Sequence, residues 1–210
     1  MADFEKCSEA LQKGRAKEVM EIVQQAIDEG MDAQSILEQA LMPGMNIIGV
    51  KFKNNEVFVP EVLIAARAMN MGAALLKPLL VEEGVEPKGK AVLGTVKGDL
   101  HDIGKNLLRM MMEGKGIEVI DVGTDVSAEK FIEAVKENDA RIVGCSALLT
   151  TTMTQMEKVV KEFEESGLRD DVKIMIGGAP VTQKYCDSIG ADLYSDDAAT
   201  AAEMAIAVFE

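Results

Sequence analysis

Residues 91–106, AVLGTVKGDLHDIGKN, decide the fold class: a short run rich in β-branched residues leads into a polar loop and then into a helical pattern. The same alternation recurs to the C-terminal end of the sequence, with further strand-like runs at 117–121, 141–145, 173–176 and, more weakly, 191–194. Strands that alternate with helices predict a parallel sheet covered by helices on both faces. Five such strands suit the order 2-1-3-4-5, in which ligands bind at the carboxyl ends of strands one and three.

The first part of the chain has a helical pattern instead. Apolar residues recur at helical spacing in segments 19–27, 36–41 and 62–69, which predicts about four helices packed as a bundle. We expect Asp32 to cap one helix and Pro43-Gly44 to mark a bend. Residues 81–90, rich in charge, glycine and proline, read as a linker. The predicted architecture is an all-α domain, residues 1–90, followed by a flavodoxin-like (Rossmann-like) α/β domain with a five-stranded parallel sheet, residues 91–210.

Composition excludes several classes of function. The formal charge of −14 over 210 residues repels nucleic-acid phosphates and anionic membranes, so no nucleic-acid or membrane partner is expected. No uninterrupted apolar run reaches the ~20 residues that span a bilayer, and the start of the chain lacks a signal-peptide pattern, which predicts a cytoplasmic protein. Three scattered cysteines, Cys7, Cys145 and Cys186, indicate reduced thiols rather than disulfides, an iron–sulfur cluster or a zinc cage.

Unusual residues gather in the loops that follow three of the predicted strands. The first loop, residues 97–106, contains the sequence's one histidine, His101. The loop after the third strand holds Ser146 and a run of threonines at 150–152, and Gly177-Gly178 follows the fourth. Because carboxyl ends of parallel strands share one edge of a sheet, these loops predict a ligand site there.

His101 has two readings. A lone histidine is most often a surface residue or a satisfied core group. Asp99, however, lies two residues before it, where its carboxylate can accept a hydrogen bond from one ring nitrogen and leave the other free as a ligand or base. One histidine cannot build an ordinary zinc site, but it suffices for a metal whose equatorial ligands come from a macrocycle.

The neighbouring residues also have structural alternatives. Asp102 reads first as a helix N-cap. Gly104 serves either close packing of helix on sheet or the approach of a flat ligand to the backbone. Gly177-Gly178 forms either a tight turn or a slot for a ligand tail. The threonine run is either a helix cap or the source of a hydroxyl that extends the hydrogen-bond relay from Asp99.

The pattern Asp99-x-His101-x-x-Gly104, then Ser146-x-Leu148, then Gly177-Gly178, resembles the cobalamin-binding domain shared by methionine synthase and the corrinoid methyl-carrier proteins of one-carbon metabolism. The helical part resembles the cap of that family through residues 41–49 and 58–62. The resemblance covers nearly the whole chain and implies a cobalamin or related corrinoid cofactor that carries a methyl group on cobalt.

Carried over residue by residue, the resemblance makes His101 the lower axial ligand of cobalt, oriented by Asp99, with Thr152 as the third relay member where methionine synthase has serine. It implies further cofactor contacts from Leu100, Asp102, Gly104, Ser146, Leu148, Thr150, Gly177, Gly178 and Ala198. In the cap, Glu38 and Phe52 match residues over the upper face of the corrin, and Val59 stands where methionine synthase has leucine.

The resemblance implies a non-catalytic corrinoid subunit, because no substrate barrel or zinc motif accompanies the carrier. Its partners would be a substrate:corrinoid methyltransferase, a second methyltransferase that passes the methyl group to a thiol or a tetrahydrofolate-type acceptor, and a reductive activator protein. Methanogenesis or acetogenesis would be the setting. A cobalamin-dependent sensor or storage protein and the small subunit of an adenosylcobalamin mutase remain alternatives, and the methyl donor stays open.

Overall fold

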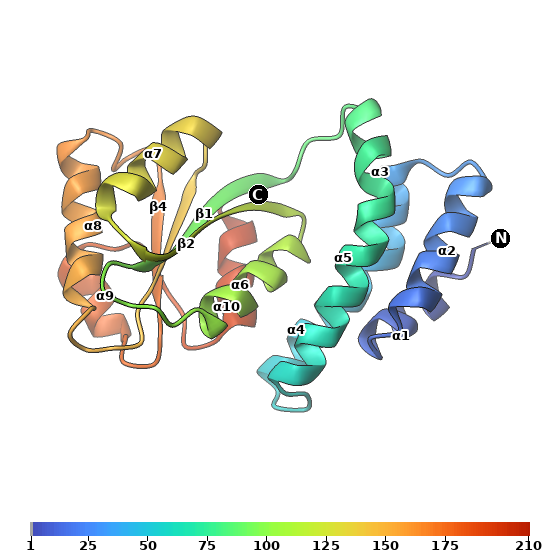
Figure 1. Ribbon diagram of the computed structural model, residues 1–210, viewed down its shortest axis with the longest axis horizontal. Helices are drawn as coiled ribbons and strands as arrows, with labels where there is room; N and C mark the ends of the chain where they lie inside the picture. The colour runs from blue at the N-terminus through green and yellow to red at the C-terminus, as the bar shows by residue number, and fades with distance from the viewer. Residues whose placement is uncertain (1) are drawn as a thin grey trace. The chain divides into compact units, whose positions relative to one another are not determined.

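The computed structural model describes residues 2–210, which divide into two compact units. The helical unit comprises the chain up to Pro87 together with the turn Gly114–Gly116, and the α/β unit comprises Lys88–Glu113 and Ile117–Glu210. Figure 1 shows the order of the elements along the chain.

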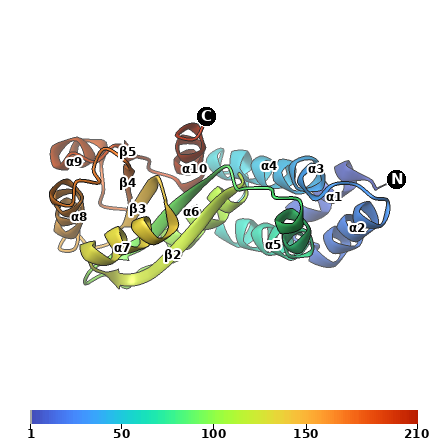
Figure 2. The same ribbon diagram turned by 90° about the horizontal axis from the view of Figure 1, so that it is seen from above.

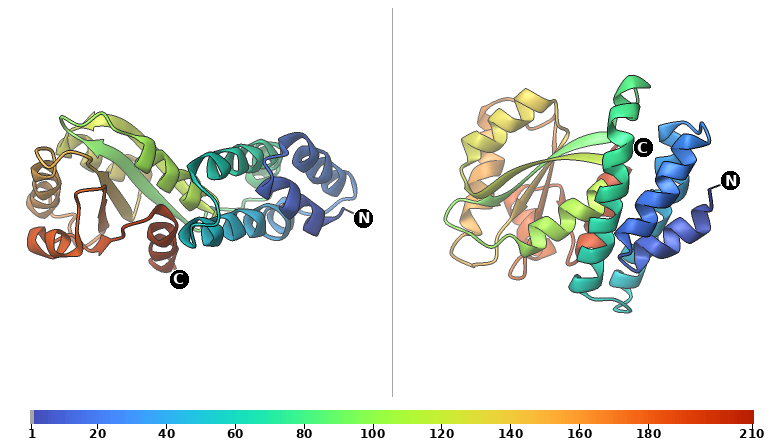
Figure 3. Two further views of the ribbon diagram at one scale, coloured as in Figure 1. Left: turned by 90° about the horizontal axis from the view of Figure 1, so that it is seen from below. Right: turned by 45° about the vertical axis from the view of Figure 1, so that its right-hand side comes forward.

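The helical unit forms a bundle around its longest helix, α5 (Figure 3). This helix contacts α1, α2 and α4. The elements are α1 (Phe4–Gln12), α2 (Ala16–Asp28), α3 (Ala33–Ile36), the π-helical turn η1 (Leu37–Leu41), α4 (Met42–Lys53) and α5 (Val59–Glu82). Because α3, η1 and α4 follow one another without a loop, the described residues of this unit make four helical rods, and the expected bundle is confirmed.

Two local expectations in this unit had different outcomes. Asp32 caps α3, because its Oδ1 accepts a hydrogen bond from the backbone N of Ser35 at 2.7 Å. The expected bend at Pro43-Gly44 was wrong, because Pro43 lies in the first turn of α4, where a helix does not need its missing N–H. The irregularity lies one turn earlier, in η1.

Helix α5 is long and apolar enough to cross a membrane by length and composition alone, a test that the core helix of a soluble protein also passes. Its buried residues pack inside the helical unit, and they recur along the helix at Val62, Ala65, Ala66, Ala68, Met69, Gly72 and Leu76. This burial identifies α5 as the central helix of the bundle.

The α/β unit contains a five-stranded parallel sheet in the order β2-β1-β3-β4-β5, as predicted (Figure 2). The strands are β1 (Gly89–Val96), β2 (Ile117–Val126), β3 (Ile142–Ser146), β4 (Lys173–Gly177) and β5 (Leu193–Tyr194). Helices α6 and α10 lie on one face, and α7, α8 and α9 lie on the other (Figure 1). Their bounds are α6 (Ile103–Glu113), α7 (Ala128–Asn138), α8 (Thr154–Glu165), α9 (Gln183–Ile189) and α10 (Ala198–Ala207).

Strand β2 is longer than the sequence predicted, because it continues past Asp121 to Val126. Gly123 and Asp125 have positive φ angles of 92° and 56°, and the register with β1 shifts at Gly94. A glycine followed by a polar residue is typical of a turn, but here these residues form an irregular strand end.

The three cysteines are buried and unpaired, in agreement with the expectation of reduced thiols. Burial raises the pKa of Cys7 to about 11 and that of Cys145 to about 12. Because the thiolate is the reactive and metal-binding form, these side chains serve as small apolar groups of the core.

Candidate functional site

Three loops follow β1, β3 and β4 at the carboxyl edge of the sheet. The ends of these strands lie in register, with Thr95 beside Ser146 and Ser146 beside Gly177. The register brings together loops that lie about 50 and 80 residues apart in the chain, as the parallel topology predicts. A site at this edge therefore combines side chains from the whole α/β unit.

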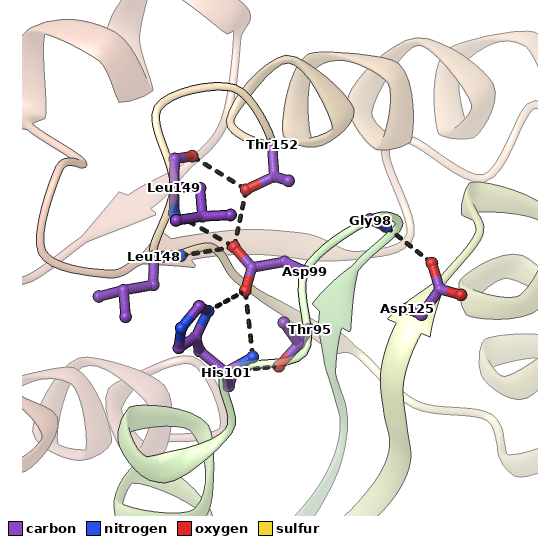
Figure 4. Close-up of polar contacts among 8 residues, drawn as sticks. All are labelled: Thr95, Gly98, Asp99, His101, Asp125, Leu148, Leu149 and Thr152. Carbon is purple, nitrogen blue, oxygen red and sulfur yellow. Dashed lines mark hydrogen bonds and ion pairs between the residues drawn. The ribbon is translucent and has the colours of Figure 1, made fainter.

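The carboxylate of Asp99 lies at the centre of this edge and is completely buried (Figure 4). Its Oδ1 accepts hydrogen bonds from His101 Nδ1 at 2.7 Å and from the His101 backbone N at 3.1 Å. Its Oδ2 accepts from the backbone N atoms of Leu148 and Leu149, at 2.8 and 3.2 Å, and lies 2.7 Å from Thr152 Oγ1. Both oxygens are thus saturated by donors from two loops.

These donors determine the charge of Asp99. Burial alone would raise its pKa, but the hydrogen bonds from Thr152, His101 and Leu148 outweigh burial and hold the pKa well below its usual range. Asp99 is therefore a fixed negative charge, which favours the His101 tautomer with its proton on Nδ1.

His101 projects from the loop with its second ring nitrogen free to bind. Its side chain is 52% exposed, whereas its backbone is fixed because Thr95 Oγ1 donates to the His101 carbonyl oxygen at 2.9 Å. The hydrogen bond between Asp99 and His101 that the two-residue spacing predicted is present. Since Nδ1 donates to Asp99, Nε2 carries the lone pair, and the imidazole can bind a metal through it.

Exposed apolar side chains lie in the loop of His101, at the start of α6 and in the loop after β3. Leu100 and Ile103 are more than 70% exposed, and Leu148 and Leu149 more than 40%. In Figure 4 the side chains of His101 and Leu148 point to the same side of the loops. No cluster of three or more potential metal ligands exists among residues 2–210. One free imidazole nitrogen, with exposed apolar side chains in the neighbouring segments, fits a metal that arrives inside a large flat macrocycle.

The glycines distinguish the alternatives that the sequence left open. A Cβ added to Gly104 would meet nothing within 4 Å, so this glycine is not required for packing of the helix on the sheet and leaves open space in the first turn of α6. A Cβ on Gly178 would lie 1.9 Å from the Ala147 carbonyl oxygen, so this glycine is required by the approach of two loops. A Cβ added to Gly177 would have only the Ser195 carbonyl oxygen nearby, at 4.0 Å, which is compatible with a slot.

The other predicted contact residues of the α/β unit lie along the same edge. Ser146 ends β3 and is half-buried, Thr150 is exposed in the following loop, and Ala198 begins α10. The Asp102 carboxylate accepts a hydrogen bond from Asn106 Nδ2 at 3.0 Å, one turn into α6. Their roles as cofactor contacts stay predictions.

The predicted cap residues all lie in the helical unit. Glu38 is exposed in η1, Phe52 is half-buried in α4, and Val59 is half-buried at the first position of α5. Within that unit, Glu38 accepts a hydrogen bond from Gln34 Nε2 at 3.1 Å. Their role over a cofactor stays a prediction.

Sequence reasoning missed an ion-paired group of residues that joins α6, the helix directly after the histidine loop, to β2. Lys105 is buried and forms an ion pair with Asp121, which also lies 3.4 Å from Arg109 Nη1 and ties α6 to β2. Burial raises the pKa of Asp121, but its hydrogen bonds with Lys105 and Gly123 outweigh burial and lower the pKa overall. A lysine on the apolar side of the predicted helix was the available signal.

Two family models, each described as a B12 binding domain, match the chain at residues 89–206 and 3–77. A corrinoid protein of Desulfitobacterium hafniense (strain Y51) is 40% identical over 208 residues, which cover 98% of this chain and 96% of the relative. The dimethylamine corrinoid protein of Methanosarcina barkeri is 45% identical over 184 residues, 87% of this chain and 86% of the relative.

A solved structure is similar over almost the whole chain. It is the methanol:cobalamin methyltransferase complex from Methanosarcina barkeri, with a TM-score of 0.87 and 30% sequence identity. The match covers 97% of this chain and 78% of the matched chain.

The Thr152 hydroxyl should stabilise the protein through Asp99. We expect Thr152→Val, which keeps the shape, to lower the free energy of unfolding by about 1.5–3 kcal/mol, because it removes a donor to a buried charge. Thr152→Ser keeps the hydroxyl and loses only a methyl group, worth about 0.8 kcal/mol. Urea unfolding measures both variants, and equal losses in the two would show that the hydroxyl contributes nothing.

Proposed function

The chain belongs to the family of B12-binding corrinoid proteins, and from this premise we propose that it carries a methyl group between two methyltransferases. One methyltransferase would deliver the methyl group from a substrate, and the other would pass it to a thiol or a tetrahydrofolate-type acceptor. The observation that supports the proposal is the half-exposed His101, whose ring is held by the buried Asp99 through Nδ1 so that Nε2 is free.

The residues of the α/β unit have a division of roles in this proposal. When bound, the corrinoid supplies a cobalt centre that can take up and release a methyl group. His101 would hold the cobalt through Nε2, and Asp99 fixes the tautomer and the direction of the ring. Thr152 in turn holds Asp99. The protein would thus supply one oriented nitrogen ligand for the cobalt.

The remaining predicted contacts would hold the body and the tail of the cofactor. Gly104 leaves the space in which a flat ring can approach α6, and Leu100 and Asp102 lie on either side of His101 in the loop. The tail would enter beside the ends of β3 and β4, along Ser146, Leu148, Thr150, Gly177, Gly178 and Ala198. Gly177 supports this path, because nothing lies closer than 4.0 Å to the position of a Cβ there.

We further propose that the helical unit, within the expected boundary of residues 1–90, caps the upper side of the corrin through Glu38, Phe52 and Val59. Residues 81–90 would be the linker that allows this cap to open for a partner; the helix α5 ends at Glu82 and β1 begins at Gly89.

A methyltransferase partner is supported by the solved relative, which belongs to a methanol:cobalamin methyltransferase complex. Another relative is named a dimethylamine corrinoid protein. Because these relatives differ in the methyl donor, we infer that the donor is chosen by the partner. The acidic chain, with a formal charge of −14, would associate faster with basic partner surfaces, at a rate that falls with added salt.

A reductive activator completes the proposed system. Restoring an oxidised cobalt needs a low-potential electron, which commonly passes through an iron–sulfur cluster held by several cysteines. The three cysteines of this chain are buried and scattered, so they offer no such cluster. The activator would therefore be a separate protein. We also propose that this chain and its partners meet in the cytoplasm, which cell fractionation would test.

The role of His101 can be tested by electron paramagnetic resonance of the protein loaded with cobalamin in the cobalt(II) form. We expect the signal to show splitting by one axial nitrogen that changes when the protein is labelled with ¹⁵N-histidine. His101 is the chain's one histidine, so the label reports on it alone. Splitting that responds instead to ¹⁵N in the benzimidazole of the cofactor would contradict the assignment.

The methyl-carrier function can be tested with the loaded, reduced protein and purified methyltransferases. We expect methyl transfer from one donor among methylamines, methanol and methoxylated aromatics, seen as an absorbance change of the corrinoid with matching loss of donor. His101→Ala should lose most of this transfer.

The need for a reductive activator can be tested with the same proteins after oxidation. Recovery should require an added protein fraction; full recovery with a mild chemical reductant alone would exclude a separate activator. Light-dependent or adenosyl chemistry without transfer would support the sensor or mutase alternatives.

The cap can be tested by photolysis of methylcobalamin supplied to the protein. If Phe52 shields the upper face, Phe52→Ala should speed photolysis several-fold, because the methyl radical escapes more easily. Phe58→Ala is a matched control, since Phe58 lies in the same unit with its side chain largely exposed. Equal rates in the wild type and Phe52→Ala would exclude a cap role for Phe52.

A further inference from the structure

We infer that Asp125, at the end of β2, is a positioning residue for His101. The inference rests on the proposed function, in which His101 is the lower ligand of the corrinoid. Asp125 does not contact the imidazole; it acts through the turn at Gly98 and Asp99 (Figure 4).

Asp125 holds this turn from two sides. Its Oδ1 accepts a hydrogen bond from the backbone N of Gly98 at 2.7 Å, and its own backbone N donates to the carbonyl oxygen of Asp99 at 3.0 Å. The two hydrogen bonds bracket the peptide bond between Gly98 and Asp99. Strand β2 thereby fixes the main chain from which the Asp99 side chain projects.

The backbone of Asp125 supports a specific role for its side chain. With φ of 56°, Asp125 lies in the left-handed region, which glycine adopts most easily, although aspartate and asparagine are enriched there among other residues. A residue held in this region by its surroundings is more frequent at functional sites. At this position a glycine would suit the backbone, but it would leave Gly98 N without the carboxylate.

The turn determines the geometry of the ligand because Asp99 is held by two separate sets of contacts. The loop after β3 holds its carboxylate through Leu148, Leu149 and Thr152, whereas β2 holds its main chain through Asp125. With both ends fixed, the Oδ1 of Asp99 has one position from which it can meet His101 Nδ1. Without the Asp125 carboxylate, the Asp125 amide still donates to the Asp99 carbonyl oxygen, but the amide of Gly98 loses its acceptor. The turn that carries Asp99 is then held at one point instead of two.

A set of three variants separates the hydrogen bond from charge and backbone strain. Asp125→Gly suits the positive φ and removes the acceptor, and Asp125→Asn removes the charge but keeps an acceptor oxygen. Asp139→Gly is the matched control, because Asp139 is also exposed with φ of 54° in the same unit, at the end of α7. Because Asp125 is exposed, all variants should fold, and urea unfolding checks this.

The first readout is the ¹⁵N-histidine NMR spectrum of the full chain without cofactor, in which His101 gives the single pair of ring signals. We expect one defined tautomer, protonated on Nδ1, in the wild type, Asp125→Asn and Asp139→Gly, and averaged or broadened ring signals in Asp125→Gly. The second readout is the affinity for cobalamin with His101 bound. It should fall about tenfold in Asp125→Gly only, the lower end for loss of a residue that supports a metal ligand.

The outcomes distinguish this inference from the function on which it rests. If wild-type protein shows no histidine nitrogen on cobalt, the proposed role of His101 fails. If the wild type shows it but Asp125→Gly matches Asp139→Gly in ring signals and affinity, Asp125 is not a positioning residue. Equal effects of Asp125→Gly and Asp125→Asn would assign the effect to charge and would also overturn the inference.

Discussion

The arrangement of the site depends on one buried carboxylate. Asp99 has no contact with solvent, so its negative charge is tolerable only if hydrogen-bond donors surround both oxygens. Those donors come from His101 on its own loop and from residues 49 to 53 positions further along the chain. The loops after β1 and β3 must therefore meet in one geometry, and the parallel register of these strands sets it. His101 is oriented as a consequence of satisfying Asp99.

Much of the fold could be predicted from hydrophobic periodicity, because the strands and helices of the α/β unit alternate regularly and the helical unit has long amphipathic segments. The parts that could not be predicted depend on backbone geometry. In η1 the chain continues through a π-helical turn just before Pro43, a place where composition alone indicates a bend. At the end of β2, a glycine and an aspartate with positive φ continue the strand instead of ending it.

In the candidate site, too, some residues could be predicted from the sequence and others depend on backbone geometry. His101 and Asp99 could be predicted from sequence, because they follow a strand whose carboxyl end is where ligands bind in this topology. The backbone amides of Leu148 and Leu149, the Thr95 hydroxyl and the Asp125 carboxylate could not, since their partners depend on register and loop conformation. The reasons for the glycines could not be predicted either, because they depend on what lies near each one. Gly178 is required by the close Ala147 carbonyl, whereas Gly104 faces open space.

Three of the five donors to Asp99 are main-chain amides, and two of these three belong to the loop after β3, where support for the carboxylate and the choice of side chain are separate demands. Any residue other than proline provides the amide that Leu148 or Leu149 donates. The identity of those two exposed side chains is therefore independent of the support they give to the carboxylate. A substitution of Leu148 or Leu149 by any residue other than proline can therefore change the exposed face of this loop while the buried Asp99 carboxylate keeps its main-chain donors.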